Sequence, residues 1–142
     1  MKKKFLFILS LLIICQAAVL SQSDDKFINA LRTCSPAYHQ KDKINVDGIN
    51  AISTKSMSGW QNGKCIYKET VNINGKDITT TCSFSKQQAD EIVSVADAYY
   101  LTLQYAQEKV DVSSLDAVKN NPVFNVMNKY LQDSSVCAMS GL

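Results

Sequence analysis

The stretch from Gly59 to Phe84 reads GWQNGKCIYKETVNINGKDITTTCSF and contains Asn-Gly-Lys twice, twelve residues apart. Asn-Gly between alternating apolar residues favours a two-residue hairpin turn, because both central positions of that turn need positive φ. We therefore expect turns at Asn62-Gly63 and Asn74-Gly75 that join three antiparallel strands. These strands are predicted at residues 49–60, 64–73 and 77–84.

With both turns centred on Asn-Gly, the side chains of the three strands sort into an apolar face and a polar face. The apolar face is expected to hold Ile52, Trp60, Cys65, Tyr67, Val71, Ile73, Ile78, Cys82 and Phe84. The polar face is expected to hold Ser53, Lys55, Lys68, Thr70, Asn72, Asp77, Thr79, Thr81 and Ser83. Ala51, Met57 and Ile66 are apolar exceptions on the polar face, which suggests partial cover there by a loop or a partner. A one-residue slip would mix the two faces, so the two turn signals together predict one buried face.

Helices are expected to cover this apolar face, because a bare three-stranded sheet must bury it. Ser85 and Gln88 form a capping box, and apolar residues at helical spacing continue from there to about Lys109. Shorter helices are predicted to begin at Ser113 or Ser114, at Asn121-Pro122, and at Asp24 or Asp25 before the sheet. The predicted fold is α+β: a three-stranded antiparallel meander with one face covered by a long helix of the C-terminal half and shorter flanking helices.

The N-terminal residues 1–21 are typical of a secretory signal peptide, with three lysines before an apolar run from Phe5 to Ile14. Cleavage is predicted after Ser21, with Ala18 as an alternative end. The apolar run is shorter than the roughly 18 residues that a membrane anchor needs. A lipoprotein acylated at Cys15 ranks second, because Ile14 stands where a small residue is preferred. We expect an exported chain, periplasmic or extracellular, with residues 22–142 forming a single disulfide-stabilised domain.

The charge of the mature chain argues against nucleic acid as a partner. Loss of the three leader lysines from 15 basic residues leaves 12 against 13 acidic residues, a formal net charge of −1. Arg32 is the only arginine, so the bidentate phosphate and base contacts of nucleic-acid binders are nearly absent. No nucleic-acid partner and no membrane span in the mature chain are therefore expected.

Four cysteines remain after the leader, an even number that predicts two disulfides in an exported protein. They are Cys34, Cys65, Cys82 and Cys137. No pair has the short spacing of a zinc site and His39 is the only histidine, so no metal or other cofactor is expected. Three connectivities are possible, and we favour Cys65 with Cys82 and Cys34 with Cys137, which ties the terminal segments together. Cys65 could join Cys82 only if a four-residue loop placed them directly opposite each other.

Structural roles explain the candidate catalytic residues of the sequence better than catalytic roles do. Cys34 lies near His39, but a nucleophilic cysteine must be a free thiolate, and an even cysteine count in an oxidising compartment predicts a bonded one. Residues 43–54 resemble a calcium loop without its decisive carboxylates, so a turn at Asp47-Gly48 is expected instead. Acidic residues on the long helix, at Asp90, Glu91 and Asp97, are explained by a solvated helix face.

The sequence therefore predicts a small exported, disulfide-stabilised binding or structural module without catalytic residues. Its expected partner is a protein that docks at an edge of the meander, along the first or third predicted strand, whose outer backbone groups are unpaired. The alternative is a secreted hydrolase or thiol-redox enzyme that uses Cys34 and His39, or the pair Cys65 and Cys82.

Overall fold

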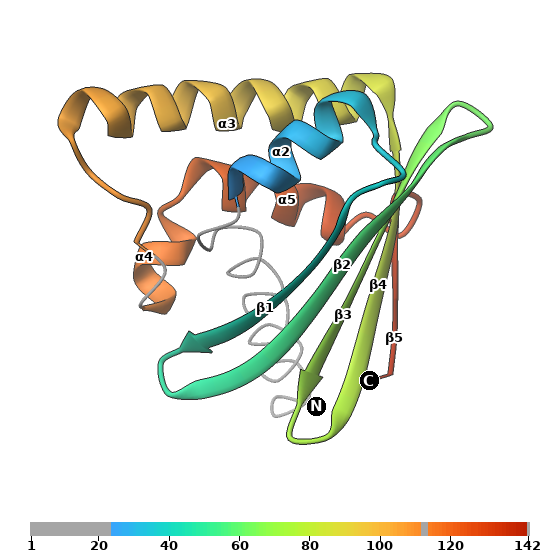
Figure 1. The fold of residues 1–142 in the computed structure, drawn as a ribbon, viewed down its shortest axis with the longest axis horizontal. Helices are drawn as coiled ribbons and strands as arrows, with labels where there is room; N and C mark the ends of the chain where they lie inside the picture. The colour runs from blue at the N-terminus through green and yellow to red at the C-terminus, as the bar shows by residue number, and fades with distance from the viewer. Residues whose placement is uncertain (1–23, 112–113, 142) are drawn as a thin grey trace.

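The computed structural model describes residues 24–111 and 114–141 (Figure 1). The helices are α2 (Asp24–Thr33), α3 (Lys86–Ala106), α4 (Leu115–Lys119) and α5 (Pro122–Leu131). The strands are β1 (His39–Val46), β2 (Ile49–Gln61), β3 (Lys64–Ile73), β4 (Lys76–Ser85) and β5 (Cys137–Ser140). The predicted leader, its cleavage after Ser21 or Ala18 and the alternative acylation at Cys15 lie outside the described residues.

The strands form one antiparallel sheet in the order β1-β2-β3-β4-β5. The predicted α+β class is confirmed, but the expectation of three strands is wrong, because β1 pairs with β2 and β5 pairs with β4. The sequence of β1, HQKDKINV, is mostly polar, and β5 is only four residues long. Neither segment has the apolar alternation that marks a strand. The two strands that the sequence placed at the edges, β2 and β4, are therefore internal. The edges of the sheet are β1 and β5.

Each Asn-Gly pair makes the predicted two-residue turn. Asn62 and Gly63 have φ of 49° and 74°, and Asn74 and Gly75 have φ of 53° and 80°. Asp47-Gly48 forms a third turn of the same kind and joins β1 to β2. Three tight turns of one type give the meander its short connections.

The helices lie together on one side of the sheet, which we call the inner face (Figure 1). The predicted capping box starts α3: the Ser85 hydroxyl accepts from the Gln88 amide, and the Gln88 side chain accepts from the Ser85 amide. Asn121 caps α5 through the amide groups of Val123 and Phe124, with Pro122 at the first helical position. Local capping chemistry thus fixes where these two helices begin.

A β-bulge in β2 changes which of its side chains face the helices. Met57 is opposite Tyr67 and Gly59 is opposite Ile66, so Ser58 is an extra residue. Gly59 has φ of 80°, a conformation that glycine adopts readily.

The predicted faces are consequently wrong for the part of β2 before the bulge. Ser53 and Lys55 are buried on the inner face with Ala51 and Met57, whereas Ile52 is 38% exposed on the outer face. The bulge therefore explains why the prediction assigned Ala51 and Met57 to the polar face. For β3 and β4 the prediction is confirmed at six positions, all of which are buried: Cys65, Tyr67, Val71, Ile78, Cys82 and Phe84.

The hydrophobic residues of the inner face fall into two clusters. The large one joins Met57, Tyr67, Cys82 and Phe84 to apolar residues of α2, α3 and α5. The small one consists of sheet residues, Ala51 and Val71 with Ile73 against them. The residues between these clusters on β2, β3 and β4 are polar.

Candidate functional site

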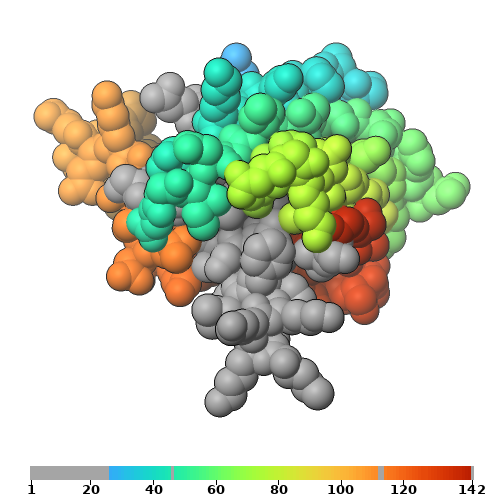
Figure 2. Space-filling view, turned by 90° about the horizontal axis from the view of Figure 1, so that it is seen from below, coloured from blue at the N-terminus to red at the C-terminus, as the bar shows by residue number. Residues whose placement is uncertain are grey.

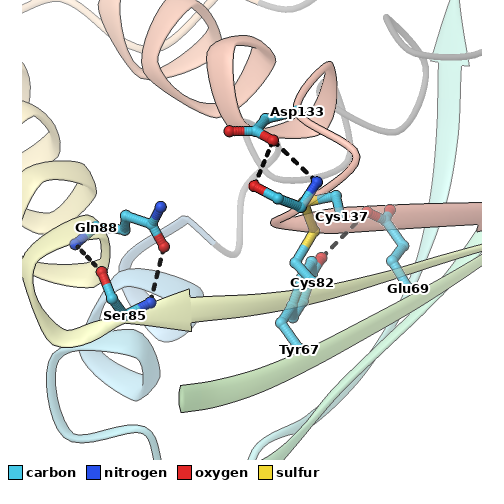
Figure 3. Close-up of a disulfide and its surroundings, with 8 residues drawn as sticks. Tyr67, Glu69, Cys82, Ser85, Gln88, Asp133 and Cys137 are labelled. Atoms are coloured by element: carbon cyan, nitrogen blue, oxygen red, sulfur yellow. Dashed lines mark hydrogen bonds between the residues drawn. A yellow bond between two sulfur atoms is a disulfide. The ribbon is translucent and has the colours of Figure 1, made fainter. Parts of the chain in front are cut away.

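The four described cysteines form two disulfides, Cys34–Cys65 and Cys82–Cys137. The favoured pairing of Cys65 with Cys82 and Cys34 with Cys137 is therefore wrong. The register gives the reason: the two-residue turn at Asn74-Gly75 places Cys65 opposite Phe84, so Cys82 is displaced from Cys65 by two positions along the strand. Cys82 instead lies directly opposite Cys137 on β5, with 4.1 Å between their Cα atoms (Figure 3).

The disulfides bear directly on the expected thiol chemistry. Cys34 is bonded to Cys65, so it is not a free nucleophile beside His39. Cys65 and Cys82 belong to different bridges, so they do not form a dithiol pair of their own. His39 opens β1 on the outer face, opposite Ser56. The thiol reading of the sequence thus has no supporting geometry among the described residues.

The acidic residues of α3 form ion pairs on the surface. Asp90 pairs with Lys86, Asp97 with Arg32, and Glu91 with Lys129. All six side chains are between 41% and 67% exposed, as a solvated helix face requires. Within the described residues, no three side chains of the metal-binding types come together as a cation site.

A group of polar side chains on the inner face was not expected from the sequence. We call it the inner polar cluster. It comprises Gln40, Asp42, Ser53, Lys55, Tyr67, Glu69 and Thr80. Lys55 and Glu69 are directly opposite each other on β2 and β3, and Thr80 is opposite Glu69 on β4. The cluster thus crosses the sheet as a row between the two hydrophobic clusters.

Hydrogen bonds and one ion pair connect the members of this cluster. Lys55 is fully buried and donates from Nζ to Asp42 Oδ2 at 3.2 Å. Gln40 also donates to Asp42, from Nε2 at 3.1 Å to each carboxylate oxygen. Asp42 is therefore the ion-pair partner of Lys55, as the cost of burying a charge demands.

Glu69 is 3% exposed and has no ion pair with a described residue. Its Oε1 accepts from the Ser53 hydroxyl at 2.6 Å. Its Oε2 accepts from the Tyr67 hydroxyl at 3.1 Å, a contact that Figure 3 shows. Burial raises the pKa of Glu69 to about 7, although the charge of Lys55 and the two hydrogen bonds act in the opposite direction. Glu69 therefore changes protonation near neutral pH.

Thr80 completes the row. It is 1% exposed, and its hydroxyl has no hydrogen-bond partner among the described residues. A buried hydroxyl without a hydrogen-bond partner lowers the stability of the fold by about 1–3 kcal/mol relative to a hydroxyl that has one. The unsatisfied group thus lies directly across the strand pair from the buried carboxyl of Glu69.

The outer face has a different character. Its side chains are largely Ser and Thr hydroxyls, with a Thr70–Thr79 contact of 3.1 Å between neighbouring strands. Four lysines share this face: Lys41, Lys43, Lys64 and Lys68. All four are exposed, and none forms an ion pair with a described residue. Asp77 is the acidic residue on the same face, so the lysines outnumber the acids there.

A shallow hollow of about 360 Å³ opens at the turn end of the sheet. It is lined by Lys43, Ile44, Asn50, Ala51, Ile52, Asn72, Asn74 and Gly75. Figure 2 views the molecule from this end and shows the β1–β2 and β3–β4 turns side by side. The described residues that line the hollow include no acid and no Ser, Thr or Cys nucleophile.

Comparison of the chain with family models, with curated protein sequences and with solved structures finds no match. The described residues contain no helix whose length and apolar character would suit a membrane crossing.

Proposed function

We propose that the chain is an exported, non-catalytic binding module whose partner is an acidic protein segment that adds to the sheet as a strand along β1. The observation that carries this proposal is β1, an edge strand of eight residues that pairs, among the described residues, with β2 alone and carries exposed lysines on its outer face. Edge strands present unpaired backbone groups, and extended peptides use them for β-augmentation. The proposal keeps the docking mode expected from the sequence but transfers it to β1.

β1 is the better of the two edges. β5 has only four residues, whereas β1 has eight and lies at the opposite edge of the sheet from β5 (Figure 1). Lysines on an edge also discourage two identical edges from pairing with each other. The same charges favour a strand that carries carboxylates.

The positions of the lysines suit an acidic extended peptide. Lys41 and Lys43 alternate on β1, so their Cα atoms lie roughly 7 Å apart, the repeat of side chains on one face of a strand. An added strand would place its own outward side chains at the same repeat. Opposite charges on neighbouring strands stabilise pairing by roughly 0.2–1 kcal/mol each.

The absence of catalysis is part of this proposal. The two disulfides support a structural role for the cysteines, and the acidic residues of α3 are surface ion partners. Thiol titration of the native protein under non-reducing conditions is expected to find no reactive thiol. One or two reactive thiols would favour the secreted thiol enzyme instead.

The main experiment measures binding of a labelled ten-residue peptide of alternating Thr and Glu by fluorescence anisotropy. A Thr-Lys peptide of the same length serves as the charge control. The variant Lys41→Glu/Lys43→Glu is expected to weaken binding of the Thr-Glu peptide by about tenfold or more, because it reverses two neighbouring charges. The matched control Lys26→Glu/Lys119→Glu makes the same charge change at exposed helix positions and should leave the affinity unchanged within about twofold.

Hydrogen exchange distinguishes strand addition from diffuse attraction. Bound Thr-Glu peptide should slow exchange of amides within residues 39–46, because an added strand accepts their outward N–H groups. Equal binding of the Thr-Lys peptide, or binding without such protection, would overturn the proposal. The proposal would also be overturned if the protein adsorbed to anionic phospholipid vesicles but did not bind the peptide.

A further inference from the structure

The inner polar cluster places two carboxyl groups around one ammonium group. Lys55 lies on β2, between Asp42 on the edge strand β1 and Glu69 on the internal strand β3. Its Nζ donates to Asp42 Oδ2 at 3.2 Å, and Glu69 is its direct partner in the register of β2 and β3. Lys55 therefore has an acid on each of the two neighbouring strands, one at the edge of the sheet and one inside it.

The balance of charge among these three groups depends on the proton of Glu69. With the proton in place, Lys55 and Asp42 supply one positive and one negative charge, which balance. Without it, the three groups carry one excess negative charge, and an excess charge in buried surroundings is costly. Lys55 is fully buried and Glu69 is 3% exposed, whereas the Asp42 side chain is 21% exposed. Asp42 is therefore the charged group of the three that is nearest to water.

Separation of β1 from β2 would move Asp42 into water and leave Lys55 and Glu69 on the internal strands. If Glu69 is protonated, separation takes the ionised carboxylate away from the buried ammonium, which is unfavourable. If Glu69 is ionised, separation leaves one carboxylate opposite one ammonium, so the charges of the remaining pair balance. Separation should therefore cost less free energy when Glu69 is ionised.

We propose that the protonation state of Glu69 controls how readily the edge strand β1 separates from the sheet, with Lys55 as the link between Glu69 and Asp42. The coupling is reciprocal. Burial is the largest cause of the raised pKa of Glu69, and the charge of Asp42 raises this pKa further. Loss of Asp42 to water therefore lowers the pKa of Glu69, and a rise in pH favours the separated strand.

The surroundings of Glu69 direct its titration toward β1. The titratable groups that act on it are Lys55 from β2, Tyr67 from its own strand and Asp42 from β1. β4 presents a threonine directly opposite Glu69, which does not titrate. The side chains that α3 buries are alanine, isoleucine and valine, and α2 packs the ring of Phe27 against Tyr67. Among the described residues, a change of charge at Glu69 thus acts on Lys55 and, through it, on β1.

This pH switch concerns the strand to which the proposed function assigns the partner. The coupling between Glu69 and β1 exists without any peptide, and only its use in regulating peptide docking rests on the proposed function. The switch is therefore tested on the free protein. Failure of the Thr-Glu peptide to bind would count against the proposed function and not against the switch.

The test measures hydrogen exchange of the free protein by NMR at pH 5.5 and pH 8. Protection factors correct for the pH dependence of the chemical exchange step, so they report the opening equilibrium. The protection of the β1 amides that pair with β2, within residues 39–46, is expected to fall by about fivefold or more from pH 5.5 to pH 8, the lower end of typical couplings between sites. The most protected amides of β3 and β4 report global unfolding, so lower protection in β1 identifies separation of β1 alone.

Three variants identify the groups that carry the effect. Glu69→Gln cannot ionise, so the protection of its β1 amides should stay nearly constant between the two pH values. Asp42→Asn keeps the titration of Glu69 but removes the charge that leaves with β1, so most of the pH dependence should disappear. The pKa of Glu69, followed by its carboxyl carbon resonance, should be lower in Asp42→Asn than in the wild type. Asp116→Asn makes the same change at an exposed helix position and should behave like the wild type.

Four results would overturn the switch. The first two are a β1 protection that stays constant or rises with pH in the wild type, and an equal fall of this protection in Glu69→Gln. The third is exchange of the β1 amides only together with the whole domain, because β1 would then not separate by itself. The fourth is an unchanged pKa of Glu69 in Asp42→Asn, which tests the link independently if Glu69→Gln folds poorly.

Discussion

The sharpest test of the inner polar cluster is the pH dependence of stability. Glu69 has its pKa raised from 4.5 to about 7, with burial as the largest cause. Below about pH 4.5 the folded and unfolded chains both hold this proton, and the carboxyl group incurs no penalty. Between about pH 4.5 and 7 the unfolded chain ionises first, so the free energy of unfolding falls as the pH rises. Above about pH 7 both states are ionised, and the penalty is constant.

The magnitude follows from the size of the shift. A rise from 4.5 to about 7 corresponds to a loss of about 3 kcal/mol of stability across this pH interval. That loss is a large fraction of the roughly 5–15 kcal/mol by which a domain is stable. Because Glu69 is only 3% exposed, solvent screening reduces it little.

The measurement compares the wild type with Glu69→Gln by urea unfolding, monitored by circular dichroism at pH 4.5, 6.0 and 7.5, with the disulfides intact. The glutamine cannot titrate, so the stability of this variant relative to the wild type should rise by about 3 kcal/mol from the lowest pH to the highest. Using the difference between the two proteins cancels the titration of the other groups to first order. It also removes any constant effect of the altered hydrogen bonds to Ser53 and Tyr67.

Glu108→Gln provides the control, because it removes an exposed carboxyl group outside the cluster. Its stability relative to the wild type should stay nearly constant over the same interval. The reasoning would be refuted if Glu69→Gln and the wild type showed parallel pH profiles. A relative stability that fell with rising pH would mean that the folded protein favours the ionised carboxylate, the opposite of what burial predicts.

Two further predictions concern the covalent and backbone constraints of the sheet. The change Cys82→Ala/Cys137→Ala should lower the free energy of unfolding in urea by about 4 kcal/mol, since the bridge spans 55 residues, and loss of the other bridge, which spans 31, should cost nearly as much. Equal stability of the reduced and oxidised proteins would contradict this expectation. Gly59→Ala should destabilise by about 1–3 kcal/mol in the same assay because of its φ of 80°, whereas Ser58→Ala at the exposed bulge residue should change stability by less than about 0.5 kcal/mol.

The sequence predicts the central hairpins well because their signals are local. Asn-Gly at Asn62-Gly63 and Asn74-Gly75 specifies both turns through four consecutive residues each, and Ser85 with Gln88 specifies the start of α3 in the same way. Each signal acts over a few residues, so no tertiary contact is needed to interpret it. The turn between β3 and β4 then determines which side chains of the two strands face the helices.

The edge strands and the disulfide pairing depend on contacts between segments distant in the sequence. β1 and β5 lack strong alternation and become strands through pairing with β2 and β4. The partner of Cys82 could not be identified without β5, because the segment that carries Cys137 had no predicted secondary structure. The register between Cys65 and Cys82 did contain a usable signal: an intact two-residue turn keeps them from being opposite each other.

The inner polar cluster could not be predicted from the sequence because of one residue, the bulge residue Ser58. Without the bulge at Ser58, alternation assigns Lys55 to solvent, where a lysine is ordinarily found, and the pattern gives no reason to question it. With the bulge, Lys55 lies opposite Glu69 on the inner face, and Asp42 from β1 becomes its ion partner. Ala51 and Met57 on the polar side were the available warning, because two small or apolar exceptions of the same parity on one strand indicate a change of register between that strand and the turn. The inner charges and the bulge are therefore one feature of the fold, and a variant that removed Ser58 would have to bury Ile52 and expose Lys55 to keep its hairpin.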